Sequence, residues 1–206
     1  MAAMNKTVIL IDGYNVYHAL DQQPEWHKYK WLDFVKLVSL FLSTNDVISG
    51  VYYFTALATW LPDKMTRHKI LIKALELRGA TIVYGNFKGK DRYCPNCKTW
   101  YRSHEEKRTD VNIAIHLYRL AIEDIFDTAM IVSADSDLVP AIQAFKRTFP
   151  AKRVGVLFPF GRSSFELKNE CDFHRKIKRN HLNQSIFPDE IDLGNGQKLV
   201  RPTTWT

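Results

Sequence analysis

Acidic side chains stand at separated places in the chain where carboxyl groups could share a metal ion. Asp12 follows the apolar run 8–11, Asp135 and Asp137 follow a second apolar run, and Asp110 opens a helical pattern. Crowded carboxylates repel one another and lose hydration, and a cation that prefers oxygen ligands, such as Mg²⁺ or Mn²⁺, relieves this conflict. Such a cation activates water and neutralises charge on a phosphate ester. The four aspartates therefore predict a divalent-metal site for phosphodiester hydrolysis.

Each of these aspartates also has an ordinary structural explanation. Asp110 suits a helix start, Asp135 or Ser136 could cap the next helix, and Asp12–Gly13 is a common turn pair. One helix needs only one cap, however, and two aspartates flank Ser136. Asn15 adds a neutral amide that could orient a water or a carboxylate. The joint pattern favours a metal site, although no single residue does.

Alternating strand and helix patterns predict the scaffold that positions these residues. Strand patterns cover residues 8–11, 46–57, 80–87, 127–134 and 152–159, and helix patterns cover residues 31–43, 63–79, 109–125, 136–149 and 162–172. Asp12 then follows the first of these strands, and Asp135 and Asp137 follow the fourth. All three lie beyond the carboxyl ends of parallel strands, where α/β sheets bind ligands. The helix after Asp110 gathers Val111, Ile115, Leu117 (or Tyr118) and Ile122 on one side. We expect an α/β fold with a central parallel sheet of about five strands flanked by helices.

Residues 88–107 interrupt this alternation with a polar excursion that lacks clear periodicity. Cys94 and Cys97 within it have the spacing of a zinc knuckle, and His104 could supply a third ligand for Zn²⁺. One CxxC pair gives only two of the four usual ligands. A reduced, exposed turn and a redox-active disulfide are the alternative interpretations.

The charge balance points to an anionic partner such as nucleic acid. The chain has 29 Lys and Arg against 22 Asp and Glu, a net charge of +7. Lys107 and Arg108 adjoin the acidic cluster, and Arg162 with Ser163 could hold phosphate after the fifth strand. Solvated charges and helix capping by Ser163 are the alternatives. The aromatic residues of 100–102 could stack on bases or pack the excursion against the body.

The remaining composition excludes several classes of protein. Three cysteines fit no extracellular disulfide framework, no apolar run is long enough for a membrane span, and the N-terminus lacks a signal-peptide pattern. We expect a cytoplasmic protein with a nuclease-like domain at 1–182 and a C-terminal tail at 183–206. The tail is expected to pack on the domain or on a partner chain. A homodimer would follow if the tail or the excursion exchanges between chains.

Four segments resemble the motifs of NYN-domain proteins, the LabA/DUF88-like branch of the PIN-like nuclease group. They are "VILIDGYNVY", "EEKRTDVNIAIHL", "IVSADSDLVPAI" and "GVLFPFGR", in the same order and within residues 6–175. The resemblance implies a three-layer PIN-like α/β fold and a ribonuclease that uses Mg²⁺ or Mn²⁺ and leaves a 5′-phosphate and a 3′-hydroxyl. It places the acidic ligands at Asp12, Asp110 and Asp135, with Asp137 as the fourth, and the family's asparagine at Asn15.

Two alternatives to a ribonuclease stay open from the sequence. The same fold could serve as a non-catalytic module that binds RNA and regulates it. A phosphohydrolase acting on a small metabolite would use the same carboxylates but would not need the basic periphery.

Overall fold

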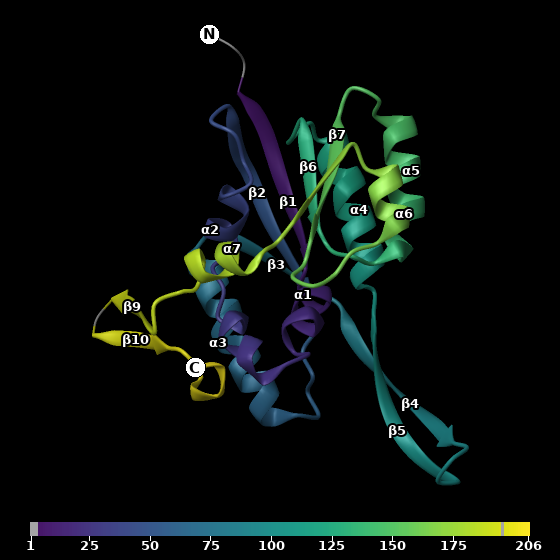
Figure 1. Ribbon diagram of the computed structural model, residues 1–206, viewed down its shortest axis with the longest axis vertical. Coiled ribbons are helices and arrows are strands. Elements are labelled where there is room, and N and C mark those ends of the chain that lie inside the picture. The colour runs from purple at the N-terminus through teal and green to yellow at the C-terminus, as the bar shows by residue number, and fades with distance from the viewer. Residues whose placement is uncertain (1–3, 195) are drawn as a thin grey trace.

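A computed structural model describes residues 4–194 and 196–206 of the chain. One sheet of six parallel strands runs through its centre in the order β3-β2-β1-β6-β7-β8 (Figure 1). The strands are β1 (Asn5–Asp12), β2 (Asp46–Thr55), β3 (Ala80–Tyr84), β6 (Thr128–Val132), β7 (Arg153–Phe158) and β8 (Phe173–Lys176). The predicted parallel sheet is confirmed and gains a sixth strand. β8 escaped prediction because this edge strand is short and mostly exposed, so it lacks an apolar pattern.

Helices cover both faces of the sheet and give the fold three layers. One face carries α1 (Gly13–Leu20), α2 (Phe34–Ser39), α3 (Pro62–Leu77) and α7 (Arg179–Gln184), and the other carries α4 (Thr109–Ile122), α5 (Val139–Thr148) and α6 (Phe165–Glu170). The central strand β1 serves both cores, because Ile9 and Ile11 point into the first and Val8 and Leu10 into the second. The 3₁₀ segments are η1 (Pro24–Lys30), η2 (Ser136–Leu138) and η3 (Thr203–Trp205). No helix among the described residues is long and apolar enough to cross a membrane.

The core-facing side of α4 contains Leu117 of the predicted apolar side but not its other aliphatic residues. Val111, Ile115 and Ile122 are exposed, whereas Ile113 and Leu117 are buried in the second core. The helix is apolar on both sides, so its periodicity alone does not decide which side packs on the sheet.

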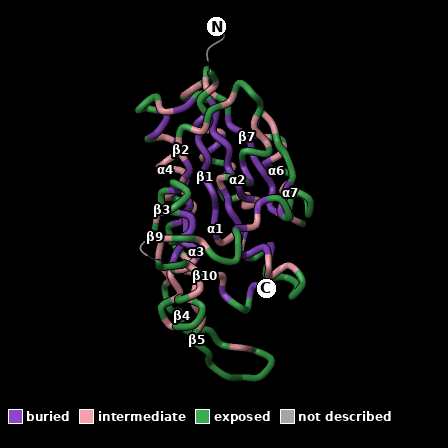
Figure 2. The backbone as a smooth tube through the Cα atoms, turned by 90° about the vertical axis from the view of Figure 1, so that its left-hand side faces the viewer, coloured by how far each residue is buried: buried purple, intermediate pink, exposed green. Residues whose placement is uncertain are grey.

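The excursion between β3 and α4 is a regular antiparallel hairpin of β4 (Asn86–Cys94) and β5 (Thr99–Lys107). It projects from the body (Figure 1), and most of its length is exposed (Figure 2). Trp100 is 71% exposed and Tyr101 50% exposed, so these aromatic side chains do not pack against the body.

The C-terminal segment forms a small hairpin, β9 (Glu190–Gly194) and β10 (Gln197–Val200), followed by η3. Trp205 is buried in the first core. The Arg201 guanidinium donates a hydrogen bond to the Lys28 carbonyl at 3.1 Å. The last residues of the chain therefore pack on the same body as the sheet.

Candidate metal centre

The carboxyl ends of β1 and β6 lie side by side at the point where the strand order changes direction. From β1 the chain continues to β2 on one side, whereas β6 and β7 extend the sheet on the other. The register pairs Ile11 with Val132, so Asp12 and Ser133 leave the sheet as neighbours. Open α/β sheets bind ligands at such a switch point.

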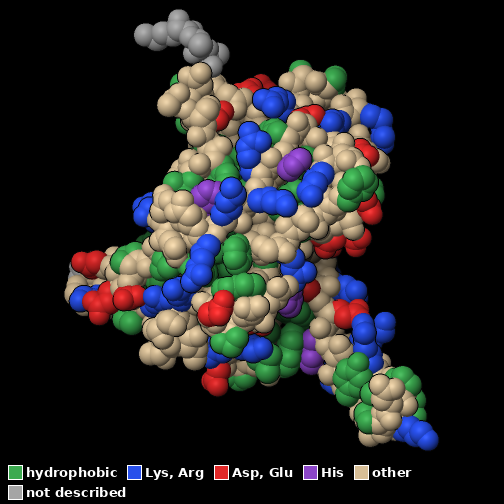
Figure 3. Space-filling model, in the orientation of Figure 1, with side chains coloured by type: hydrophobic (Ala, Val, Ile, Leu, Met, Phe, Trp, Pro, Cys, Tyr) green, Lys and Arg blue, Asp and Glu red, His purple; other side chains and the backbone are tan. Residues whose placement is uncertain are grey.

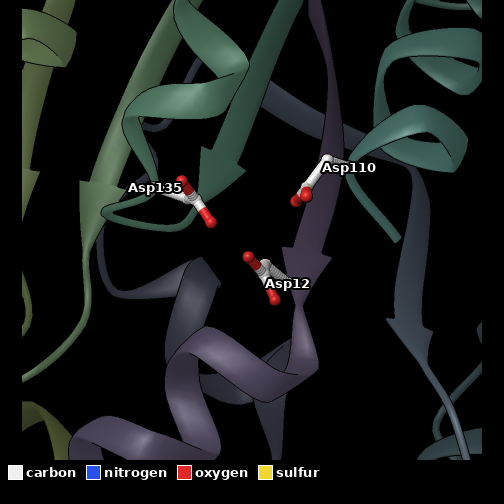
Figure 4. A group of neighbouring side chains, drawn as sticks. All are labelled: Asp12, Asp110 and Asp135. Carbon is white, nitrogen blue, oxygen red and sulfur yellow. The ribbon is translucent and has the colours of Figure 1, made fainter. Parts of the chain in front are cut away.

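Three carboxylates meet at this place. One oxygen from each of Asp12, Asp110 and Asp135 lies within 4.8 Å of the others. Figure 4 shows the three side chains pointing toward one another from the end of β1, the start of α4 and the loop after β6. Asp12 is buried, and the other two are partly exposed. We call this group the carboxylate centre.

Hydrogen bonds fix the buried carboxylate from two sides. The backbone N–H of Asn15 donates to Asp12 Oδ1 at 2.9 Å, and Ser133 Oγ donates to Asp12 Oδ2 at 3.0 Å. Ser133 Oγ in turn accepts from the backbone N–H of Asp135 at 3.1 Å. Asp12 thus caps α1, a role that the sequence pattern did not assign to it, and also belongs to the carboxylate centre.

The loop that carries Asp135 is held against α1. The side-chain oxygen of Asn15 accepts from the Ala134 backbone N–H at 3.0 Å, and Asp135 Oδ1 accepts from the Asp137 N–H at 3.0 Å. The residue that caps the following 3₁₀ turn is therefore Asp135 and not Ser136. Asp137 is exposed and lies outside the group of three. Its role as a fourth ligand stays a prediction.

Burial and mutual repulsion make the carboxylate centre costly to ionise. Desolvation, with smaller contributions from the charges of Asp110 and Asp135, raises the pKa of Asp12 to about 6. Desolvation and the charges of Asp135 and Asp137 raise the pKa of Asp110. An all-oxygen donor set in which Asp12 and Asp110 have raised pKa values fits a hard divalent cation, which would favour the ionised forms of these two groups.

A further carboxyl group, which the sequence prediction missed, lies beside the carboxylate centre. Glu106 at the end of β5 is partly buried, and Oγ1 of Thr109 donates to its Oε1. Desolvation first, then the charges of Asp12 and Asp110, raise the pKa of Glu106 to about 8. The position of Glu106 depends on β5 being a strand that leads directly into α4, and the polar sequence of the excursion did not reveal that strand.

Comparison with known proteins assigns the chain to a family. Residues 6–178 match the NYN domain. The chain belongs to the NYN domain family. NYN domains are generally nucleases of the ribonuclease type, related to the PIN group, and the match does not separate the branches of the family.

Two other similarities accompany the NYN match. The chain is 26% identical over 216 aligned positions to 6-hydroxy-3-succinoylpyridine 3-monooxygenase HspA of Pseudomonas putida, covering 86% of this chain and 67% of that protein. It superposes on the crystal structure of VPA0982, a protein of unknown function from Vibrio parahaemolyticus, with a TM-score of 0.59 at 18% identity. That superposition covers 87% of this chain and 97% of VPA0982, and it shows a shared fold.

The predicted phosphate contacts of this NYN domain are exposed side chains. Arg162 and Ser163 lie in the β7–α6 loop, and the residue that caps α6 is Ser164, not Ser163. Lys107 forms an ion pair with Glu105 at 3.1 Å. Arg108 has a φ of 79°, a left-handed conformation that is rare for a residue with a side chain, directly before α4.

The structure does not assemble the suggested zinc ligands. In the hairpin register Cys94 pairs with Thr99 and His104 pairs with Gly89, so five residues, about 17 Å of strand, separate His104 from the level of Cys94. His104 instead stacks on Trp60, with ring centroids 3.7 Å apart. Among the described residues, the three-ligand groups include neither Cys94 nor Cys97. The excursion is a straight hairpin, and this geometry excludes His104 as a ligand shared with the cysteines.

Proposed function

We propose that this NYN domain is a ribonuclease that hydrolyses RNA with a divalent cation, Mg²⁺ or Mn²⁺, held by Asp12, Asp110 and Asp135. The observation that carries the proposal is the approach of these three carboxylates to within 4.8 Å, from three separate segments, at the switch point of the sheet. When bound, such a cation supplies activation of a water molecule and charge neutralisation on the phosphodiester.

The chain's own residues orient the carboxylates before any ligand arrives. Asp12 has no freedom to turn, because both of its oxygens accept hydrogen bonds. Asn15 acts as a positioning residue, since its amide oxygen holds the loop of Asp135 on α1. We include Glu106 as the fourth carboxyl group of the site. It is a group beside the carboxylate centre whose protonation changes near neutral pH in the metal-free protein.

Cations near the carboxylate centre are suited to hold the phosphates of RNA. We assign this contact to Arg162, Lys107 and Arg108, which are exposed residues in the β7–α6 loop and directly before α4. Figure 3 shows Lys and Arg side chains across the body and along the β4–β5 hairpin, in keeping with the net charge of +7. This basic periphery favours a polyanion over a small phosphorylated metabolite.

The oxidation named for the Pseudomonas relative is not part of this proposal. At 26% identity the relative supports a common ancestry of the domain, whereas the NYN match and the carboxylate centre both point to phosphodiester chemistry.

Cleavage of a mixed RNA pool tests the proposal. We expect cleavage with Mn²⁺, none with EDTA, and a loss of at least a hundredfold in Asp12→Asn and in Asp135→Asn. Asp192→Asn is the matched control, because Asp192 is an exposed residue of β9. Full activity in Asp135→Asn would contradict the proposed site. RNA binding without cleavage under every metal tested would favour the non-catalytic module.

A further inference from the structure

A cavity of about 410 Å³ lies next to the carboxylate centre, between α1, the end of β2, α3 and the base of the β4–β5 hairpin. Gly13, which follows Asp12 in the chain, forms part of its wall. We call it the aromatic cavity, after the side chains of Tyr14, Trp60 and Phe87 that line it. Its volume is in the range that holds a small organic molecule or one nucleotide.

The aromatic rings of this cavity are fixed by contacts with one another. Trp60 meets Phe87 edge to face at 4.7 Å, and Phe87 meets Tyr14 edge to face at 5.2 Å. Trp60 also lies parallel to His104 of β5, with an interplanar angle of 9°. Figure 3 shows hydrophobic and histidine side chains together where the hairpin leaves the body. Rigid aromatic walls favour a flat ring as the occupant.

Positive charge accompanies the rings. Lys64 and Arg67 of α3 line the cavity, and within residues 4–194 and 196–206 neither forms a salt bridge. The acidic side chain of the cavity, Asp21, is already matched by the buried Lys30, which forms an ion pair with it, and by His27 at 3.4 Å. The free charge of the wall is therefore cationic and suits an anionic group.

The cavity and the carboxylate centre share a boundary. His104 and Glu106 are two residues apart on β5, so their side chains lie on the same face of that strand. His104 contacts the ring of Trp60 at the cavity, and Glu106 is close enough to Asp12 and Asp110 for their charges to act on it. The charge of Glu106 likewise acts on Tyr14 in the cavity wall. An RNA chain that places a phosphate at the carboxylate centre thus has the cavity directly beside it.

We propose that the aromatic cavity receives one unpaired nucleotide of the RNA that flanks the scissile phosphate, with its base against Trp60 and Phe87 and its phosphate toward Lys64 and Arg67. This proposal rests on the proposed ribonuclease function. A base within such a cavity cannot keep its pairing partner, so the cavity selects single-stranded RNA or an unpaired loop. Every base can stack on an aromatic ring, so the cavity distinguishes unpaired from paired nucleotides more than it distinguishes one base from another.

Direct binding of mononucleotides in EDTA tests this proposal without the need for metal or turnover. The probes are AMP and UMP, with adenosine and ribose 5-phosphate as the separate halves and 6-hydroxynicotinate as a ring acid that is not a nucleotide. Calorimetry is performed on the full chain, on Trp60→Leu and on Arg67→Gln. Trp100→Leu, which changes an exposed tryptophan of the hairpin, and Lys69→Gln, which changes an exposed cation of α3 outside the cavity, are the matched controls.

We expect AMP and UMP to bind more tightly than either half. Trp60→Leu should weaken the binding of AMP and UMP about five- to a hundredfold, as the loss of a base–aromatic stack does. Arg67→Gln should weaken the binding of AMP and UMP but not the binding of adenosine. Both controls and Asp135→Asn should bind like the wild type. The last result separates this proposal from the proposed function, because binding in Asp135→Asn survives even where RNA cleavage is lost.

Three results would overturn the nucleotide assignment. They are no binding of AMP or UMP, binding that is unchanged in Trp60→Leu, and binding of 6-hydroxynicotinate in preference to both nucleotides. The third result would identify the cavity as a site for a small heteroaromatic acid.

Discussion

The side-chain oxygen of Asn15 accepts a hydrogen bond from the backbone N–H of Ala134 at 3.0 Å, and this bond ties the loop after β6 to the first turn of α1. Asp12 lies three residues before Asn15 in the chain, and Asp135 directly follows Ala134. The relative placement of two of the three carboxylates therefore depends on an amide that need not touch a metal.

Removal of this amide should loosen the carboxylate centre without unfolding the protein. Asn15→Ala leaves the Ala134 N–H without its partner, and we expect it to cost about 1 kcal/mol of the free energy of unfolding. Because the loop of Asp135 is then less constrained, Mn²⁺ affinity should fall about tenfold or more. Urea unfolding and Mn²⁺ calorimetry measure the two effects. Unchanged Mn²⁺ affinity in a folded variant would show that Asn15 does not position the site.

Stability of the metal-free protein should depend on pH through Asp12. Its pKa is raised from 3.8 to about 6 in the folded state, so the folded protein holds this proton more tightly than the unfolded chain does. Asp12 therefore disfavours folding progressively as the pH rises from about 4 to about 6, by about 3 kcal/mol at most. Above about pH 6 this contribution is constant.

The matching variant is Asp12→Asn, which keeps an oxygen acceptor for the cap of α1 but carries no charge. In EDTA we expect it to be more stable than the wild type at pH 8 and to lose that advantage near pH 4. Urea unfolding across this pH range, with Asp192→Asn as the control, measures the difference. A difference that stays constant with pH would contradict the assigned origin of the effect.

Glu106 and Asp137 should contribute unequally to metal binding. Glu106 is partly buried beside Asp12 and Asp110, whereas Asp137 is exposed and lies outside the group of three. We expect Glu106→Gln to weaken Mn²⁺ binding about tenfold at pH 8 and Asp137→Asn to weaken it less. Calorimetry on both variants decides between them. A larger effect of Asp137→Asn would indicate that the fourth ligand is Asp137, as the family resemblance implies.

The outer part of the β4–β5 hairpin should contribute to RNA binding but not to stability. Lys90 and Ser103 are paired, so residues 91–102 can be replaced by a two-residue Asn-Gly turn. The removed segment is mostly exposed and includes three cations, Arg92, Lys98 and Arg102. We expect an unchanged melting temperature and weaker binding of single-stranded RNA. The slope of log K against log salt concentration should become smaller in magnitude by about 1–2. An unchanged salt dependence would place the RNA elsewhere.

The parts of the fold that sequence could predict are those with a strong apolar pattern. The run 8–11 is apolar at every position because β1 packs on helices at both faces, and this pattern indicated a central parallel strand. The same logic was only partly right for α4, because Leu117 of the predicted apolar side is buried whereas Val111, Ile115 and Ile122 are exposed. β8 and the strands of the hairpin carry few buried residues, so their pairing was not visible in the sequence.

For the candidate site, the sequence indicated the carboxylates that follow strands or open a helix. Asp12, Asp110 and Asp135 lie together because parallel strands deliver their carboxyl ends to one edge. Glu106 and the aromatic cavity depend on where the base of the hairpin meets the β2–α3 loop, which is a tertiary contact between distant residues such as Trp60 and His104. No local pattern encodes such a contact.

The proposed metal site is tested most directly by measuring Mn²⁺ binding and RNA cleavage on the same sample. A fluorescently labelled single-stranded RNA is cleaved under single-turnover conditions while Mn²⁺ is titrated, and calorimetry gives the binding curve. We expect the cleavage rate to rise with occupancy of the site in the wild type and in Asp192→Asn. We expect Asp135→Asn to lose both binding and cleavage. Cleavage that persists in Asp135→Asn, or that does not change with Mn²⁺ occupancy, would contradict the claim that Asp12, Asp110 and Asp135 form the catalytic metal site.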